Sequence, residues 1–355
     1  MALSKRFVIG IPGKRIDANI KKILLDVNPI GIILFKRNIN QEKPDQLKQL
    51  CNEIRELFGK KDFLIMVDEE CKRVSRLGAL LGCGLLNGSD IRGIKDEMTA
   101  DLLLSMQSEI IAINLMRFGF NCLCGPVIDV FHKDINAFAM NERSWSDNVG
   151  DVSRRAKLII ENNSKYGIMS IIKHLPGTGR VLGDPHVLHS SINDIGKKNL
   201  LPIKDVIEDD IMAFKGIVDF VDAGMFAFAR YGVDDNLPAA RSHKIVSYVK
   251  NIMTERFISF TDAIEMFGAY DIKSSEFQAL PELARVDYIK KMANECLSAG
   301  IDFVIYANPI LINSINGVNV NHELDIGSFE KYLNLFSDGF PVCSDSLLNR
   351  LSCVM

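Results

Sequence analysis

Short apolar runs alternate along the chain with segments of helical periodicity. Eight runs are apolar enough to predict buried strands, at 7–11, 31–35, 63–67, 121–130, 168–172, 218–227, 257–262 and 301–306. Between them, apolar residues with helical spacing predict helices at 17–27, 43–58, 96–118, 149–166, 203–214, 244–254 and 283–299. Such alternation is typical of parallel strands that are joined by right-handed helical crossovers.

Eight strand–helix units are the number found in a closed (β/α)8 barrel, and 355 residues lie within its usual range. The alternative is an open doubly wound sheet, which often has a glycine-rich turn after its first strand, and Gly10-Ile11-Pro12-Gly13 fits that pattern poorly. No low-complexity linker divides the chain. We therefore predict an α/β fold, a single-domain TIM barrel over 1–355, with a core at about 7–310 and a C-terminal helical cap at about 320–355.

Composition narrows the class of protein without identifying it. Hydrophobic residues make up 47% of the chain and charged residues 25%, as in an ordinary globular protein. A net charge of −3 with no basic stripe argues against nucleic acid as a partner. No apolar run approaches the ~20 residues that span a bilayer, and the first residues do not resemble a signal peptide. We therefore expect a cytoplasmic protein without a membrane partner.

The eight cysteines are scattered, and several lie inside apolar runs. In a chain of this length without a secretory signal, we expect reduced thiols. Cys122-x-Cys124 lies in a predicted strand, and its spacing fits no common zinc pattern, so core packing is the better interpretation. No metal site is predicted.

One polar stretch follows the fifth apolar run. It begins with Lys173 and His174, continues through prolines and glycines, and ends with Asp184-Pro185-His186. Proline and glycine in this density predict a loop, so these side chains should lie just beyond the carboxyl end of a buried strand. That is where α/β barrels place their chemistry. A histidine two residues from a carboxylate is well suited to proton transfer near neutral pH.

Other polar side chains lie at or just after the ends of three further predicted strands: Asp68, Glu70, Asp129, Arg143 and Asp262. Each has an ordinary structural explanation when taken alone. Asp262 could cap a helix, Arg143 could pair with Glu142 at the surface, and His174 could be a core histidine. Their convergence on one face of the predicted barrel favours a functional site.

The motif Lys173-His174-x-Pro176-Gly177-x-Gly179-x4-Asp184-x-His186 resembles the signature of family 3 glycoside hydrolases, in the branch of bacterial β-N-acetylglucosaminidases, or β-hexosaminidases. Further similarities occur in the same order as in the family, at Gly31–Asn38, Val67–Arg76, Gly125–Val130, Asn141–Trp145, Phe260–Met266 and Ala299–Asp302. The resemblance extends from about residue 7 to 310, which is nearly the whole predicted barrel.

The resemblance implies a retaining mechanism with a covalent glycosyl-enzyme. Asp262 would be the nucleophile, and His186, paired with Asp184, would be the acid/base. The residues that would bind the sugar are Asp68, Arg73, Arg143, Lys173 and His174. The implied substrates are GlcNAc-containing muropeptides or oligosaccharides, released from peptidoglycan and recycled in the cytoplasm. The resemblance implies no cofactor and no metal, and we expect a monomer.

Three positions depart from the family pattern. Cys71-Lys72 replaces two glycines of the third-strand motif, Phe228 lies where an Ala-His pair is usual, and Ala263 replaces a second aspartate after Asp262. Two alternatives to an active hydrolase therefore stay open, a degenerate glycan-binding barrel and a phosphorolytic β-N-acetylglucosaminidase. Retention of the three chemical residues favours the active enzyme.

Overall fold

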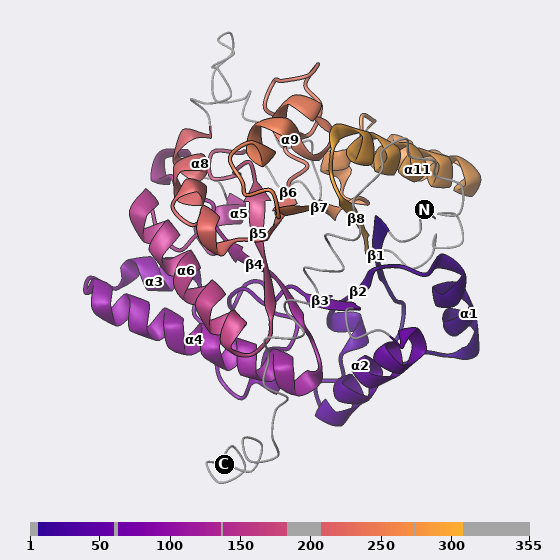
Figure 1. Ribbon diagram of the computed structural model, residues 1–355, viewed down its shortest axis with the longest axis horizontal. Coiled ribbons are helices and arrows are strands. Elements are labelled where there is room, and N and C mark those ends of the chain that lie inside the picture. Colours follow the sequence, from indigo (N-terminus) through magenta and orange to yellow (C-terminus); the bar gives the residue numbers. More distant parts are fainter. Residues whose placement is uncertain (1–5, 60–62, 136–137, 183–206, 273, 308–355) are drawn as a thin grey trace.

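The protein is described here by a computed structural model that covers residues 6–59, 63–135, 138–182, 207–272 and 274–307. Eight parallel strands pair in chain order and close into a barrel (Figure 1). They are β1 (Phe7–Gly10), β2 (Gly31–Leu34), β3 (Leu64–Val67), β4 (Cys122–Val127), β5 (Met169–Leu175), β6 (Ala223–Phe226), β7 (Ile258–Ala263) and β8 (Phe303–Tyr306). The predicted TIM barrel is confirmed, whereas the predicted C-terminal cap lies outside the described residues.

Helices cover the outside of the barrel (Figure 1). The longer ones are α1 (Ala18–Val27), α2 (Pro44–Phe58), α4 (Glu97–Phe118), α6 (Val149–Lys165), α8 (Glu208–Lys215), α9 (His243–Lys250) and α11 (Glu282–Ala299). The side chains of Asp17 and Asp96 cap α1 and α4 by accepting from backbone N–H groups of the first turn. The short helices α3 (Gly88–Gly93), α5 (Phe138–Asn141) and α10 (Ser274–Ala279) were not predicted. None of the described helices is long and apolar enough to cross a membrane.

Three strand boundaries differ from the sequence prediction by three or more residues. β4 ends at Val127, before Asp129, and a 3-10 turn at Val218–Phe220 precedes the start of β6. The third difference matters for the site, because β5 continues through Lys173 and His174 to Leu175. The prediction that these two residues follow the strand was therefore wrong. Their side chains have partners on neighbouring elements, which allows a charged residue to occupy a buried strand position.

The barrel interior is filled by one cluster of apolar side chains, which includes Leu64 and Met66 of β3, Met169 and Ile171 of β5, and Ile258 and Phe260 of β7. Intervening residues such as Ile65 and Ile172 belong to a second cluster that packs against the helices. Side chains alternate between the two faces of a strand. On β3, β5 and β7, the next residue that faces the interior lies two positions further along the chain. These residues are Asp68, Lys173 and Asp262. The apolar filling is thus covered by a charged layer at the carboxyl ends of the strands.

Candidate active site

Lys173 lies between two carboxylates that come from the end of β3. Its Nζ is 2.7 Å from Asp68 Oδ1, and it also contacts the carboxylate of Glu70. Burial alone would lower the pKa of Lys173, but Asp68 and Glu70 outweigh this and raise it. The pKa values of both carboxyl groups are lowered in spite of burial, with Lys173 contributing to each. All three groups therefore stay charged at neutral pH.

Arg143 joins this cluster from the loop that follows α5. Its Nε and Nη2 atoms donate to the two oxygens of Glu70, at 2.8 and 3.0 Å. This bidentate geometry fixes the plane of the guanidinium group. Burial would lower the pKa of Arg143, but Glu70, Asp129 and Asp262 raise it. Arg143 is therefore a fixed positive charge among three carboxylates.

His174 is held from both sides of its ring. Arg143 Nη2 lies 2.9 Å from His174 Nε2, and His174 Nδ1 lies 2.7 Å from Asp129 Oδ2. A guanidinium group only donates, so Nε2 must accept and Nδ1–H must donate to Asp129. The second oxygen of Asp129 accepts from Thr178 N at 2.6 Å. His174 is thus a ring of defined orientation that links Arg143 to Asp129.

Asp262 lies near the end of β7 and is partly buried. Its Oδ1 accepts from Ala263 N at 2.7 Å, and no side chain among the described residues forms a hydrogen bond or ion pair with it. Burial raises the pKa of the Cys124 thiol inside the barrel, with Asp68 and Asp262 raising it further and Lys173 lowering it. These three charges therefore lie around the same interior thiol. The structure brings Asp262 to the same end of the barrel as the cluster.

Asp210 of α8 was missed by sequence reasoning, since an acidic residue in a first helical turn normally indicates a cap. Its two oxygens accept from Val130 N at 2.6 Å and from Gly179 N at 3.1 Å. A Cβ at Gly179 would lie 2.1 Å from Val130 O, and Gly177 has a φ of 140° and packs against Asp210. These two glycines are required for the close approach. Asp210 thus joins the end of β4 to the start of the glycine-rich loop.

The remaining predicted site residues have different outcomes. Asp184 and His186 lie outside the described residues. Arg73 is half-exposed and pairs with Glu142 at 3.0 Å. Its role in binding a sugar stays a prediction.

Three further residues belong to the cluster although the resemblance did not assign them a role. Glu70 and Asp129 were visible in the sequence only as carboxylates after predicted strands. Arg76 Nη2 lies 3.4 Å from Asp68 Oδ2. All three could be found in the sequence only from their positions after a strand. Residue type alone does not indicate which carboxylate at a strand end binds a cation.

The departures from the family pattern do not distort the backbone. Glu70 N and Cys71 N both donate to Val74 O, which closes a tight turn, and neither Cys71 nor Lys72 has a positive φ. The Cys71 side chain is buried and Lys72 is exposed. Phe228 is completely buried in the cluster between barrel and helices. The turn therefore forms without glycine, and Phe228 is a core residue.

A model of the family described as "Glycosyl hydrolase family 3 N terminal domain" matches residues 5–329. The chain belongs to glycosyl hydrolase family 3. This confirms the family resemblance found in the sequence, and with it the expectation of a glycosidase.

Individual relatives agree with this assignment. The chain is 27% identical over 271 residues to a beta-hexosaminidase of Haemophilus influenzae, covering 74% of this chain and 72% of that protein. It is 30% identical over 244 residues to a beta-hexosaminidase of Hydrogenovibrio crunogenus, covering 66% and 63%. The structure of NagZ from Neisseria gonorrhoeae in complex with N-trifluoroacetyl-D-glucosamine is similar with a TM-score of 0.75 and 26% identity, covering 92% of this chain and 89% of that one.

Proposed function

We propose that this glycosidase is a retaining β-N-acetylglucosaminidase that removes terminal β-GlcNAc from peptidoglycan-derived fragments in the cytoplasm. Membership of family 3 and relatives named beta-hexosaminidase support the reaction class. The observation that carries the proposal is the charged layer above the apolar barrel filling, in which Asp68, Lys173 and Arg143 form a fixed cluster and Asp262 lies nearby.

The cluster retains polar atoms that can bind a sugar. Lys173 has three N–H groups and uses two on Asp68 and Glu70. Arg143 Nη1 has no hydrogen-bond partner among the described residues, and the Asp68 side chain is 16% exposed. A carboxylate beside two cationic donors matches the hydroxyl and acetamido groups of GlcNAc, which both donate and accept. The fixed charges would orient the sugar at little further entropic cost.

The proposed chemistry has two steps. Asp262 attacks the anomeric carbon and forms the glycosyl ester, while His186, supported by Asp184, transfers its proton to the leaving oxygen. In the second step His186 takes a proton from water, and the water oxygen displaces Asp262 from the anomeric carbon. Configuration at the anomeric carbon is therefore retained. All assigned residues come from one chain, and we propose that a single-domain monomer is active.

Release of phenolate from an aryl β-GlcNAc tests this function. We expect turnover that does not depend on phosphate, with β-GlcNAc as the first product detected by NMR. Formation of GlcNAc 1-phosphate in phosphate buffer would indicate the phosphorolytic alternative. Measurable GlcNAc binding without turnover in either buffer would indicate a degenerate glycan-binding barrel and would contradict the proposal.

A further inference from the structure

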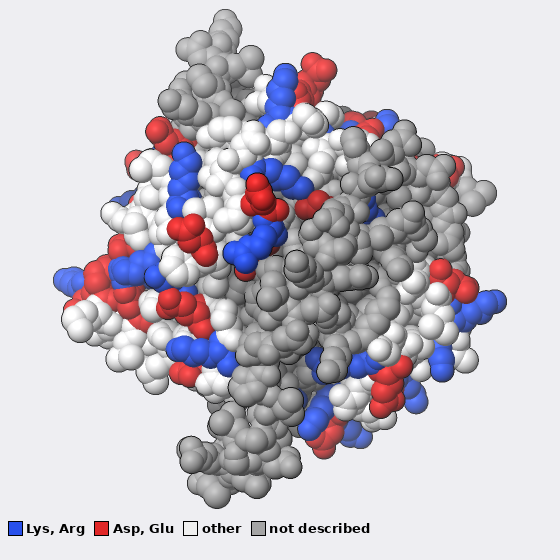
Figure 2. Space-filling view, in the orientation of Figure 1, with Lys and Arg blue, Asp and Glu red and all other residues white. Residues whose placement is uncertain are grey.

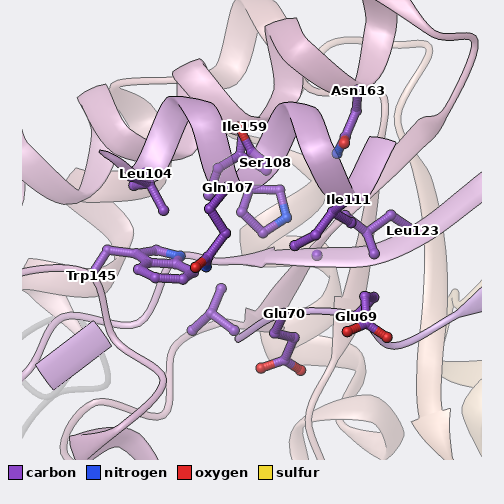
Figure 3. A pocket seen from close by; sticks show the side chains of 13 residues that line it. Glu69, Glu70, Leu104, Gln107, Ser108, Ile111, Leu123, Trp145, Ile159 and Asn163 are labelled. Carbon is purple, nitrogen blue, oxygen red and sulfur yellow. The ribbon is translucent and has the colours of Figure 1, made fainter. Parts of the chain in front are cut away.

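A cavity of about 20 Å³ lies behind the charged cluster, between β4 and the helices α4 and α6. Its lining is mostly apolar, but Glu69 and Glu70 reach it from the end of β3, and Trp145 and Asn163 reach it from other sides (Figure 3). A cavity volume of roughly 10–15 Å³ is enough to hold one water molecule. The cavity is thus large enough for one internal water.

Three polar atoms of the lining residues are buried without a hydrogen-bond partner in the part of the chain that the structure describes: Glu69 Oε1, Trp145 Nε1 and Asn163 Oδ1. Other polar lining side chains have partners: Gln107 bonds to both backbone groups of Leu86, Ser108 Oγ donates to Ser105 O, and Glu70 accepts from Arg143. An unpaired buried polar atom costs about 1–3 kcal/mol. A water molecule, which donates twice and accepts readily, can satisfy either kind of atom, the indole donor or a carboxylate or amide acceptor.

We propose that this cavity is a binding site for internal water, and that the bound water makes Glu69 a positioning residue for Asp68 and Glu70. The first part depends only on the cavity and its unpaired atoms. The second part rests on the proposed function, because it assigns Asp68 and Glu70 to sugar binding. The two parts are therefore tested by different measurements.

Glu69 determines the shape of the loop between β3 and Leu77. Its Oε2 accepts from Arg76 N and Leu77 N, both at 2.7 Å. Arg76 in turn reaches back to Asp68 with its side chain. Burial raises the pKa of Glu69, and these backbone donors lower it only in part. Water at Oε1 would satisfy the remaining oxygen, so that the carboxyl group does not rotate away from the two backbone N–H groups.

Trp145 makes the water site measurable, because it is the chain's single tryptophan. Ile159→Phe places a ring in the cavity, whereas Ile160→Phe makes the same change at a buried neighbour on α6 that does not line the cavity. We expect Ile159→Phe to shift Trp145 emission to shorter wavelength, as water leaves the indole N–H, and Ile160→Phe to leave it unchanged. A high-resolution crystal structure of the wild type should show water within hydrogen-bond distance of Glu69 Oε1 or Trp145 Nε1. A dry cavity, or equal emission from the two variants, would overturn the water site.

Kinetics with the aryl β-GlcNAc test the positioning role. Glu69→Gln keeps an acceptor for Arg76 and Leu77 and a polar atom in the cavity, so we expect wild-type emission and KM. Glu69→Leu removes both, and we expect KM to rise on the order of tenfold with a smaller change in kcat. An unchanged KM in Glu69→Leu would overturn the positioning role while leaving the water site intact. Absence of turnover by the wild type would instead contradict the proposed function, which the emission measurement does not depend on.

Discussion

The two sides of the charged layer are built differently. On the side of β3 to β5, Asp68, Glu70, Lys173 and Arg143 are linked by ion pairs and are largely buried. On the side of β7, Asp262 is partly buried and bonds to a backbone N–H of its own strand end. The β3 to β5 side holds its charges in fixed mutual contact. On the β7 side, no cationic side chain in the described part of the chain contacts Asp262 directly.

This difference fits a division of work between binding and chemistry. A group that orients a substrate gains from being fixed beforehand, because less entropy is lost on binding. A nucleophile needs an available lone pair, which a direct ion pair would weaken. Arg143 still lies close enough to Asp262 for that carboxyl group to contribute to the raised pKa of the guanidinium group, after Glu70 and Asp129. We infer that proximity without pairing leaves the Asp262 oxygens available for nucleophilic attack.

The largest expected effect comes from the β7 side. Asp262→Asn should lower turnover of the aryl β-GlcNAc by roughly 10⁴-fold or more, the scale on which loss of a covalent nucleophile acts. It should also prevent labelling by a fluorinated mechanism-based sugar, followed by the mass of the intact protein. Thermal unfolding of the variant serves as the control for folding. Labelling of Asp262→Asn at the wild-type rate would show that another residue is the nucleophile.

The second effect tests the paired side. Lys173→Met keeps the length of the side chain but leaves Asp68 and Glu70 without their shared cation. Breaking a buried ion pair in this way costs about 3–5 kcal/mol, because the remaining charges are uncompensated. The free energy of unfolding in urea should fall by that amount, and kcat/KM should fall with it.

Lys157→Met is the matched control, because Lys157 pairs with Glu161 at 3.8 Å on the exposed face of α6. Exposed pairs contribute about 0–1 kcal/mol. We expect little change in stability or activity from this variant. Equal destabilisation by the two substitutions would mean that the Lys173 cluster is no more than a surface network.

A third, smaller effect separates the inner arginine from the one at the edge. Arg143→Lys keeps the charge but loses the bidentate contact with Glu70 and the link to His174. We expect KM to rise on the order of tenfold. Arg73→Lys should change KM less, since Arg73 is half-exposed and pairs with Glu142. A larger effect at Arg73 would place the sugar further toward the edge than the cluster indicates.

The sequence predicted the barrel well because each strand contains a short, buried apolar run. It also contained the charged layer, since Asp68 and Asp262 continue the inward series of β3 and β7 by one step of two residues. It failed at Lys173 and His174, which a local pattern assigns to a loop. Their burial depends on partners more than forty residues away, such as Asp68 and Asp129, and no local pattern contains such contacts. The same reason explains why Asp210 was missed.

The smallest expected effect concerns Glu265, which lies in the turn after Asp262. Burial, with a contribution from Asp262, raises the pKa of Glu265 to about 8, and its Oε2 has no hydrogen-bond partner among the described residues. The β7 side therefore places a carboxyl group that is protonated at neutral pH next to Asp262. A raised carboxyl pKa means that the folded state holds a proton that the unfolded chain releases above about pH 4.3.

The contribution of Glu265 to the stability of the wild type should therefore decrease as the pH rises from about 4.3 toward 8, and Glu265→Gln, which does not titrate, should lack that decrease. We expect the free energy of unfolding of Glu265→Gln, relative to that of the wild type, to increase by at least about 1 kcal/mol from pH 5 to pH 8, as measured in urea. At pH 4 the difference between the two proteins should be at its minimum, because Glu265 is then largely protonated in both states. A difference that stays constant from pH 4 to pH 8 would mean that Glu265 ionises alike in the folded and unfolded chain. In that case Glu265 would carry a negative charge beside Asp262 at neutral pH. The comparison between the β3 to β5 side and the β7 side would then have to include repulsion between these two carboxyl groups.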